Sequence, residues 1–222
     1  MNEQLLVVGD VHGCFYTFQL MIAKHWRVNE EVLVQVGDLI DRGNYSPECV
    51  ATARSLASRF PGRAVFLKGN HEFECALYHR KRSNPGWLSQ GGRETLHQYK
   101  LSDRSLAEDI AWMDSLPLLY ENDHVLITHA GVANTPDPFS EMNSHGVLWN
   151  RIPLKNIGKM QIVGHTPIEG DPEFVDAENK WNIDTGAYRG HALSALRISN
   201  TGRILELIRI PTAAKDYIGT RE

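Results

Sequence analysis

The feature that most constrains the fold of this chain is a set of five short apolar runs, each of which ends directly in a motif rich in polar residues and glycine. Short apolar runs bounded by glycine and polar residues are typical of buried strands. The motifs, in chain order, are Gly9-Asp10-Val11-His12-Gly13, Gly37-Asp38-Leu39-Ile40-Asp41-Arg42-Gly43, Gly69-Asn70-His71-Glu72, His129-Ala130-Gly131 and Gly164-His165-Thr166. In open α/β sheets the ligand crevice lies at the carboxyl ends of the strands, so the five motifs are expected to converge on one place.

Helical patterns separate the first three strands, which we place at residues 5–8, 32–36 and 64–67. Apolar residues recur at helical spacing between residues 15 and 22 and again between residues 50 and 60. This β-α-β-α-β order predicts a parallel sheet with right-handed crossovers.

The rest of the chain is predicted to add helices first and then more strands. Residues 73–118 are mostly helical in pattern, and their expected core contacts are Trp87, Leu88, Leu96, Ile110, Trp112 and Met113. Further strands are expected at residues 125–128, 161–163, 182–183, 193–198 and 204–210. Residues 199–202 have the sequence of a hairpin turn between the last two strands. We therefore expect one α/β domain over residues 1–222, with a mixed sheet system.

The donor atoms of the five motifs point to a metal centre. Together the motifs supply carboxylate, amide and imidazole side chains and no thiolate, at Asp10, His12, Asp38, Asn70, His129 and His165. Such a nitrogen and oxygen set suits manganese, iron or zinc. These six side chains exceed the needs of one four-coordinate zinc, and they suffice for two metal ions if one carboxylate bridges them.

The ten histidines of the chain divide by position. Four of them, His12, His71, His129 and His165, lie in the motifs at the predicted strand ends. His191 is interpreted as a partly exposed strand residue that could line the pocket. Surface or packing roles are expected for the others, which are His25, His79, His97, His124 and His145.

Charge and cysteine content exclude several classes of protein. The net charge of -4 argues against a nucleic-acid partner bound by bulk electrostatics. No apolar run is long enough to span a bilayer, and no signal peptide is visible, so no membrane association is expected. Three cysteines cannot form a disulfide framework, which favours a reducing, cytoplasmic compartment.

Other hydrolase chemistries lack their motifs in this chain. No arginine follows Cys14, Cys49 or Cys75 at the spacing of a Cys-x5-Arg phosphate cradle. The chain contains neither the Gly-x-Ser-x-Gly elbow of serine hydrolases nor the Gly-x4-Gly-Lys loop of P-loop NTPases.

The five motifs resemble those of the calcineurin-like metallophosphoesterases, and within them the phosphoprotein phosphatase branch with its short bacterial and phage members. Trp149-Asn150-Arg151 and Asp184-Thr185-Gly186-Ala187 also resemble that branch, so the resemblance covers residues 5–198. It implies two mixed β-sheets packed face to face and flanked by helices, an α/β/β/α sandwich.

The resemblance also implies roles for individual residues. The first metal ion would be held by Asp10, His12 and Asp38, and the second by Asp38, Asn70, His129 and His165. His71 would be the general acid and Asp41 would orient it. Arg42, Arg151 and Asn70 would bind the substrate phosphate. The cofactors would be two divalent ions, Mn²⁺ in the first place and Fe or Zn as alternatives, and a hydroxide bridging them would attack phosphorus directly.

The substrate implied by the resemblance is phosphoserine, phosphothreonine or phosphotyrosine in proteins. Dinucleoside polyphosphates such as diadenosine tetraphosphate are the main alternative, followed by phosphodiesters in general and by a non-catalytic metal-binding scaffold. By the same resemblance, symmetrical diadenosine tetraphosphatases often lack the carboxylate at the position of Asp41 and carry Asp at the position of Glu72. The presence of Asp41 and Glu72 therefore favours the phosphatase. We expect residues 73–118 and 132–151 to cap the crevice and set specificity, with Tyr188 and Arg189 as further substrate contacts. No regulatory subunit is expected.

Overall fold

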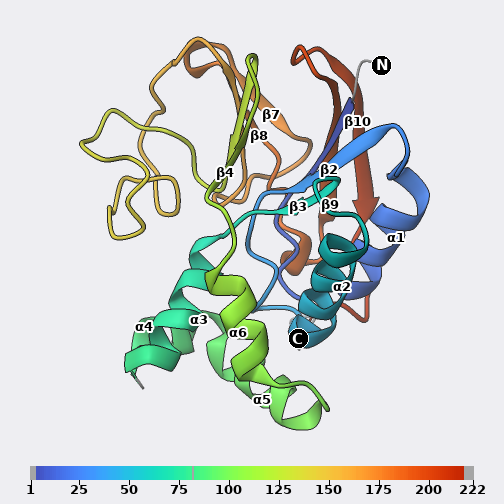
Figure 1. Ribbon diagram of the computed structural model, residues 1–222, viewed down its shortest axis with the longest axis vertical. Coiled ribbons are helices and arrows are strands. Elements are labelled where there is room, and N and C mark those ends of the chain that lie inside the picture. Colours follow the sequence, from blue (N-terminus) through green and yellow to red (C-terminus); the bar gives the residue numbers. More distant parts are fainter. Residues whose placement is uncertain (1–3, 82, 218–222) are drawn as a thin grey trace.

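The computed structural model describes residues 4–81 and 83–217 (Figure 1). The helices are α1 (Phe15–His25), α2 (Ser46–Arg59), α3 (Asn70–Lys81), α4 (Pro85–Trp87), the π-helical turn η1 (Leu88–Gly92), α5 (Arg93–Leu101), α6 (Leu106–Asp114) and the short 3₁₀ turns η2 (Asp176–Glu178) and η3 (Ala187–Arg189). The strands are β1 (Gln4–Val8), β2 (Glu31–Gln35), β3 (Ala64–Phe66), β4 (Leu119–Glu121), β5 (Val125–Thr128), β6 (Met160–Val163), β7 (Glu173–Val175), β8 (Lys180–Asn182), β9 (Ala192–Ser199) and β10 (Ile204–Pro211).

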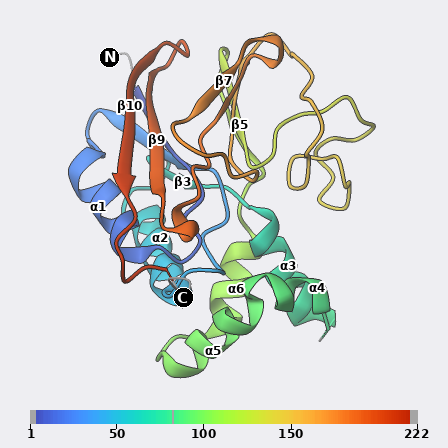
Figure 2. The same ribbon diagram turned by 180° about the vertical axis from the view of Figure 1, so that it is seen from behind.

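The first sheet has the strand order β10-β9-β1-β2-β3. β1, β2 and β3 are parallel neighbours, which confirms the predicted β-α-β-α-β unit with α1 and α2 as its connections. β9 is antiparallel to both β1 and β10. β9 and β10 lie at the outer edge of this sheet beside α1 (Figure 2). Their hairpin turns at Gly202, whose φ of 81° is in the left-handed region that glycine tolerates.

The second sheet has the strand order β4-β5-β6-β8-β7. Its central strands β5, β6 and β8 are parallel, and the edge strands β4 and β7 are antiparallel to their neighbours. The sequence patterns had not indicated either edge strand. Each has three residues that are exposed or only half-buried, so neither carries a run of buried apolar residues or a clear alternation.

The two faces of the first sheet bury two different cores. Leu5 and Val7 of β1 point into the layer between the sheets, where they pack in one cluster with Ile127 of the second sheet. Leu6 and Val8 point to the opposite face and pack with the helices. Strands buried on both faces are apolar at every position rather than at alternate ones, which explains the continuous apolar runs.

The helical segment is confirmed where the sequence placed it. Residues 73–118 contain most of α3 and all of α4 to α6, and all six expected core contacts belong to the helix-side core or pack against it. In the part of the chain that the structure describes, no helix has the length and apolar character needed to cross a bilayer.

The fold class is confirmed as two mixed sheets with helices. The helices pack on the first sheet, on the face turned away from the second sheet (Figure 1). The second sheet has a different cover. Leu126 on its outer face packs with Val132 and Val147, which belong to an irregular segment, residues 129–159, that contains no helix.

The layer between the sheets should contribute strongly to stability. Leu196 of β9 is fully buried there, so we expect Leu196→Ala to lower the free energy of unfolding by about 2–5 kcal/mol through lost burial and a residual cavity. Urea unfolding followed by circular dichroism measures this change. Leu101→Ala, at a side chain 76% exposed at the end of α5, is the control and should change it by less than about 0.5 kcal/mol. Equal losses in the two variants would contradict a core between the sheets.

Candidate metal centre

The polar motifs converge where strands of the two sheets end. Asp10 and His12 follow β1, and Asp38 follows β2. Asn70 and His71 are the first two residues of α3, which follows β3. His129 follows β5 and His165 follows β6 in the second sheet. All seven side chains are buried, with at most 7% of any residue exposed. The parallel pairing of β1 with β2 and of β5 with β6 brings these motifs side by side.

Asp38 lies between two groups of histidines. Its Oδ2 is 3.3 Å from Nε2 of His12 and 3.9 Å from Nε2 of His71. Its Oδ1 is 3.5 Å from Nε2 of His129, which is in turn 3.1 Å from Nδ1 of His165. The two carboxylate oxygens therefore face two separate clusters, either of which could hold a metal ion.

The hydrogen bonds of two histidines leave ring lone pairs directed into this site. Nδ1 of His12 donates to the carbonyl oxygen of Ile40 at 2.9 Å, and Nδ1 of His129 donates to that of Val36 at 3.1 Å. A carbonyl oxygen only accepts, so in the neutral ring the Nε2 atom carries a lone pair. Nε2 of His129 faces Oδ1 of Asn70 at 3.0 Å as well as Asp38. Converging lone pairs repel one another unless a cation lies among them, and a backbone carbonyl on the far ring nitrogen is typical of metal-ligating histidine.

Buried polar atoms without partners give the same indication. Among the described residues, Oδ1 of Asp10 and Nε2 of His165 have no hydrogen-bond partner, although Oδ2 of Asp10 accepts the backbone N–H of His165 at 3.0 Å. Unsatisfied buried polar atoms are rare and need a physical explanation. Burial raises the pKa of Asp10, and the nearby carboxylates of Asp184 and Asp38 raise it further. A bound divalent cation would satisfy Oδ1 of Asp10 and offset the negative charge, while His165 turns its other ring nitrogen, Nδ1, toward His129 and Asn70, so the donor set fits metal ions.

Asp184 is a neighbour of this site to which the sequence reasoning assigned no role. It is buried, its Oδ1 accepts the backbone N–H of Gly186 at 3.0 Å, and its Oδ2 has no partner within the described part of the chain. Burial, together with the charge of Asp38, raises its pKa to about 6. The motif at residues 184–187 marked the segment, but only the structure places this carboxylate beside Asp10 and Asp38.

His71 and Asp41 form a buried pair. Nδ1 of His71 lies 2.6 Å from Oδ2 of Asp41. Burial alone would lower the pKa of His71, but the charge of Asp38 and the hydrogen bond to Asp41 outweigh it and raise the pKa. Because Asp41 engages Nδ1, Nε2 is the ring atom directed toward the other groups of the site.

Two arginines were expected to bind phosphate, and the structure places them differently. The guanidinium of Arg42 is at the centre, with Nη1 2.7 Å from Nε2 of His12 and Nη2 2.9 Å from Nε2 of His71. It also lies over the ring of Tyr188 at 4.5 Å. Arg151 is exposed at the rim, where Nη1 donates to Oγ1 of Thr166 at 3.2 Å.

Of the remaining expected contacts, Tyr188 adjoins the centre, where its ring meets that of His12 edge to face with centroids 5.0 Å apart, whereas Arg189 and His191 lie outside it. Arg189 donates through Nε to the hydroxyl of Tyr188 at 3.0 Å and is exposed to solvent. His191 is exposed and precedes β9 rather than lying within it. Its backbone nitrogen and oxygen bond to Gly186 and Thr212.

Backbone strain is concentrated at the site. Seven non-glycine residues in the described part of the chain have positive φ, and five of them are predicted site residues: His12, Asp38, Asp41, Arg42 and His165. Each such conformation costs about 1–3 kcal/mol and persists only where the surroundings enforce it. Gly164 shows how tightly the loops are packed, because a Cβ there would collide with Oδ1 of Asp10.

Glu72 is a further residue whose role only the structure reveals. Its buried carboxylate accepts the backbone N–H groups of Asp38, Leu39 and Gly69 at 2.8, 2.8 and 2.9 Å. Burial and the charge of Asp38 raise its pKa to about 7, although these hydrogen bonds oppose the shift. Glu72 therefore joins the loop after β2 to the loop after β3. The sequence placed it in a motif but did not indicate this contact.

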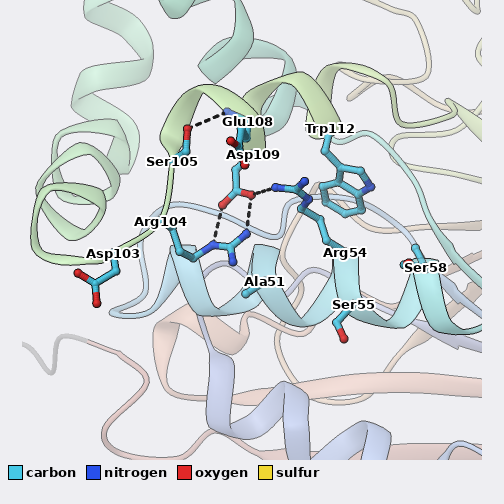
Figure 3. Close-up of a pocket in the computed structure, with 11 residues that line it drawn as sticks. Ala51, Arg54, Ser55, Ser58, Asp103, Arg104, Ser105, Glu108, Asp109 and Trp112 are labelled. Atoms are coloured by element: carbon cyan, nitrogen blue, oxygen red, sulfur yellow. Dashed lines mark hydrogen bonds and ion pairs between the residues drawn. The ribbon is translucent and has the colours of Figure 1, made fainter.

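A large cavity of about 740 Å³ lies away from this centre, between α2 and α6 (Figure 3). Its lining contains none of the predicted site residues. At its centre the guanidinium groups of Arg54 and Arg104 both bond to the carboxylate of Asp109, which is fully buried. The tyrosine hydroxyl of Tyr99 donates to the same carboxylate at 2.9 Å. These contacts fasten α5 and α6 to α2, and the cavity is separate from the candidate metal centre at the strand ends.

Comparisons with known proteins agree with this geometry. A family model described as calcineurin-like phosphoesterase matches residues 4–194. Serine/threonine-protein phosphatase 1 of Salmonella typhimurium is 32% identical over 207 aligned positions, which cover 86% of this chain and 90% of the relative. The asymmetrical bis(5'-nucleosyl)-tetraphosphatase PrpE of Anoxybacillus flavithermus is 28% identical over 240 positions, covering 93% of each chain.

Solved structures share the fold. A serine/threonine phosphatase from Saccharomyces cerevisiae with similarity to human phosphatase PP5 superimposes with a TM-score of 0.69 and 21% identity, covering 96% of this chain and 80% of that one. A putative diadenosine tetraphosphatase superimposes with a TM-score of 0.66 and 20% identity, covering 96% of each chain.

The two clusters around Asp38 should bind two divalent ions, and each cluster should depend on its own ligands. We expect Asn70→Ala and His165→Ala each to retain one metal ion where the unaltered protein retains two, because each removes a donor atom from the cluster that faces His129. Metal content after dialysis against Mn²⁺, measured by mass spectrometry, tests this. His145→Ala, at an exposed histidine outside the motifs, should retain both ions. Two bound ions in either ligand variant would refute the assignment.

Proposed function

The chain belongs to the calcineurin-like phosphoesterase family and is a hydrolase, and we propose that it is a metal-dependent phosphomonoesterase acting on phosphoserine and phosphothreonine in proteins, with phosphotyrosine as a further substrate. The phosphatase named among its relatives supports this substrate class. Membership of a hydrolase family argues against the alternative of a non-catalytic metal-binding scaffold.

The observation that carries the proposal is the buried pair of His71 and Asp41, 2.6 Å apart. A serine or threonine alkoxide is a poor leaving group and needs a proton as it departs. Imidazolium is a suitable donor near neutral pH. Asp41 holds Nδ1 of His71, so Nε2 would deliver the proton to the leaving oxygen. The carboxylate also stabilises the protonated ring, in agreement with the raised pKa of His71.

We propose two metal sites that share the carboxylate of Asp38. Asp10, His12 and Asp38 would hold the first ion, and Asp38, Asn70, His129 and His165 would hold the second, with Mn²⁺ as the proposed metal and Fe or Zn as alternatives. When bound, a pair of divalent ions neutralises phosphoryl oxygens and lowers the pKa of water, which makes direct hydrolysis without a phosphoenzyme feasible.

The chain's own cations would bind the substrate phosphate. A guanidinium can donate two parallel hydrogen bonds to phosphate oxygens, which a lysine ammonium cannot do. Arg42 is positioned for this because its guanidinium already lies among His12 and His71. We propose that Arg151 at the rim and the amide of Asn70 contribute further contacts.

Hydrolysis of dinucleoside polyphosphates is the second candidate function. It is favoured by the relative named as an asymmetrical bis(5'-nucleosyl)-tetraphosphatase, whose alignment covers 93% of this chain. Asp41 and Glu72 favour the phosphatase over the symmetrical diadenosine tetraphosphatases by resemblance, and both make buried contacts in the site. A broad phosphodiesterase activity is a third outcome that the same centre could give.

Two segments around the site are proposed to determine specificity. Residues 73–118 supply the contacts of α4 and α5 to Asp41. Residues 132–151 are attached beside the site by Glu141, which pairs with the buried Nζ of Lys68 at 2.5 Å. In addition, Phe73 and Trp149 stack edge to face with ring centroids 5.8 Å apart. We also propose a reducing, cytoplasmic setting, which the three buried free thiols support.

A substrate panel separates these functions. With Mn²⁺ we expect the highest kcat/KM on phosphoserine and phosphothreonine peptides, lower values on diadenosine tetraphosphate and the lowest on a phosphodiester. EDTA should abolish all three activities, because the ligand clusters would lose their ions. A preference for the dinucleotide would replace the phosphatase proposal with the second candidate, and a preference for the phosphodiester would replace it with the third.

Removing the proton donor should penalise poor leaving groups most. We expect His71→Asn to reduce turnover of a phosphoserine peptide by about 10²-fold or more, the usual scale of general acid catalysis. The loss with p-nitrophenyl phosphate should be much smaller, since p-nitrophenolate departs without a proton. Steady-state kinetics on the two substrates, with metal content measured in parallel, tests the role. Equal losses on both substrates would rule it out.

A further inference from the structure

We propose that Trp87 and Thr95 are positioning residues that fix the Asp41 carboxylate and, through it, the ring of His71. The inference rests on the proposed function of His71 as the proton donor. Three side chains converge on the carboxylate: Oδ2 accepts from Nδ1 of His71 at 2.6 Å and from Nε1 of Trp87 at 2.7 Å, and Oδ1 accepts from the hydroxyl of Thr95 at 2.5 Å. All four residues are at most 2% exposed.

A closed ring of hydrogen bonds strengthens the contact of Thr95. The backbone N–H of Asp41 donates to Oγ of Ser46 at 3.0 Å, and this oxygen is 3.2 Å from Oγ1 of Thr95. The hydroxyl proton of Thr95 is used on Asp41, so the hydroxyl of Ser46 is the donor in this contact. Each hydroxyl in the ring donates and accepts at once, and such chains polarise and reinforce one another.

The segment that carries the two residues is shaped to reach Asp41. Between Trp87 and Thr95 the chain makes the π-helical turn η1, in which Gly91 has a φ of 113°. A Cβ on Gly91 would come within 2.8 Å of Cβ of Asp41, and a Cβ on Gly92 would collide with the indole of Trp87. The turn therefore packs directly against Asp41 because both positions are glycine. Core filling alone would not require the indole N–H to point at a carboxylate.

The physical consequence is an Asp41 carboxylate that cannot rotate. A carboxylate held by one donor can turn about its Cβ–Cγ bond, whereas donors on both oxygens fix its plane. His71 is attached to it only through Nδ1, so the direction of Nε2 depends on that plane. Small misplacement of a reacting group can reduce a rate by about 10²-fold. Trp87 and Thr95 would act on the position of the His71 ring only through Asp41, without touching the substrate or the reacting atoms.

The test uses Thr95→Val, which removes one donor and keeps nearly the same shape, and Trp87→Phe, which removes the indole donor and keeps an aromatic ring of smaller size. We expect each to lower kcat on a phosphoserine peptide by about 10-fold, the usual lower scale for outer-shell partners, and to change kcat on p-nitrophenyl phosphate by much less. In the His71→Asn background neither substitution should reduce kcat further, because the donor they position is gone. A full additional loss in that background would overturn the proposal.

Matched controls exist elsewhere in the chain. Thr17→Val removes a hydroxyl that donates to the buried carboxylate of Asp216 at 2.6 Å, and Trp26→Phe removes an indole donor to the carbonyl of Glu31 at 3.4 Å. Both should lower Tm without changing the ratio of kcat values on the two substrates. A change of that ratio in the controls as large as in Thr95→Val would show a general packing effect and overturn the proposal.

A spectroscopic readout separates this proposal from the proposed function. The Nδ1 proton of His71, shared with a carboxylate, should give a low-field proton resonance in the metal-free protein that His71→Asn removes. We expect Thr95→Val and Trp87→Phe to shift this resonance and the two controls to leave it in place. An unshifted resonance would overturn the positioning role even if His71 is the acid. A shifted resonance with equal kinetic losses on both substrates would support positioning of the ring and refute the acid role.

Discussion

The structure depends most on the burial of Asp38 at the junction of the two sheets. Burial alone would raise the pKa of this carboxyl, but three imidazoles and the guanidinium of Arg42 outweigh it and hold the pKa below its usual range. Oδ1 accepts the backbone N–H of His71 at 3.1 Å, and the backbone N–H of Asp38 itself donates to Glu72. A buried charge must be paired on several sides, so the surrounding loops are arranged around this one group.

This constraint explains why the site combines strain, buried charge and glycine. His12, Asp38 and His165 all adopt positive φ, which a fold avoids unless neighbouring contacts enforce it. The sheets supply that enforcement, because β1, β2, β5 and β6 are buried and their ends cannot move independently. The stability of the buried layers thus holds an arrangement of proposed metal ligands that would be unfavourable by itself.

The proposed general acid depends on a different part of the molecule. Asp38 and the other proposed metal ligands are held by the strand ends, whereas Asp41 is held by Trp87 and Thr95 from the helical segment. On the other side of the site, Glu141 and Lys68 fasten the irregular cover of the second sheet. Relatives named as protein phosphatase and as tetraphosphatase share this fold over most of the chain, so substrate choice is expected to lie in such segments rather than in the centre.

Local pattern by itself determined the parallel strands of the first sheet, the helical segment and the convergence of the motifs, because strand period, helix period and polar residues at strand ends are visible within a few residues of sequence. The edge strands β4 and β7 escaped this reasoning, since half-exposed three-residue strands leave no periodic signal. Only the tertiary structure decided that Glu72 joins two loops, that Asp184 lies beside Asp10, and that Trp87 and Thr95 hold Asp41. Such contacts join residues far apart in the chain, with 54 positions between Thr95 and Asp41 and more between Asp184 and Asp10, and they depend on how packed layers bring side chains together, which no local period encodes.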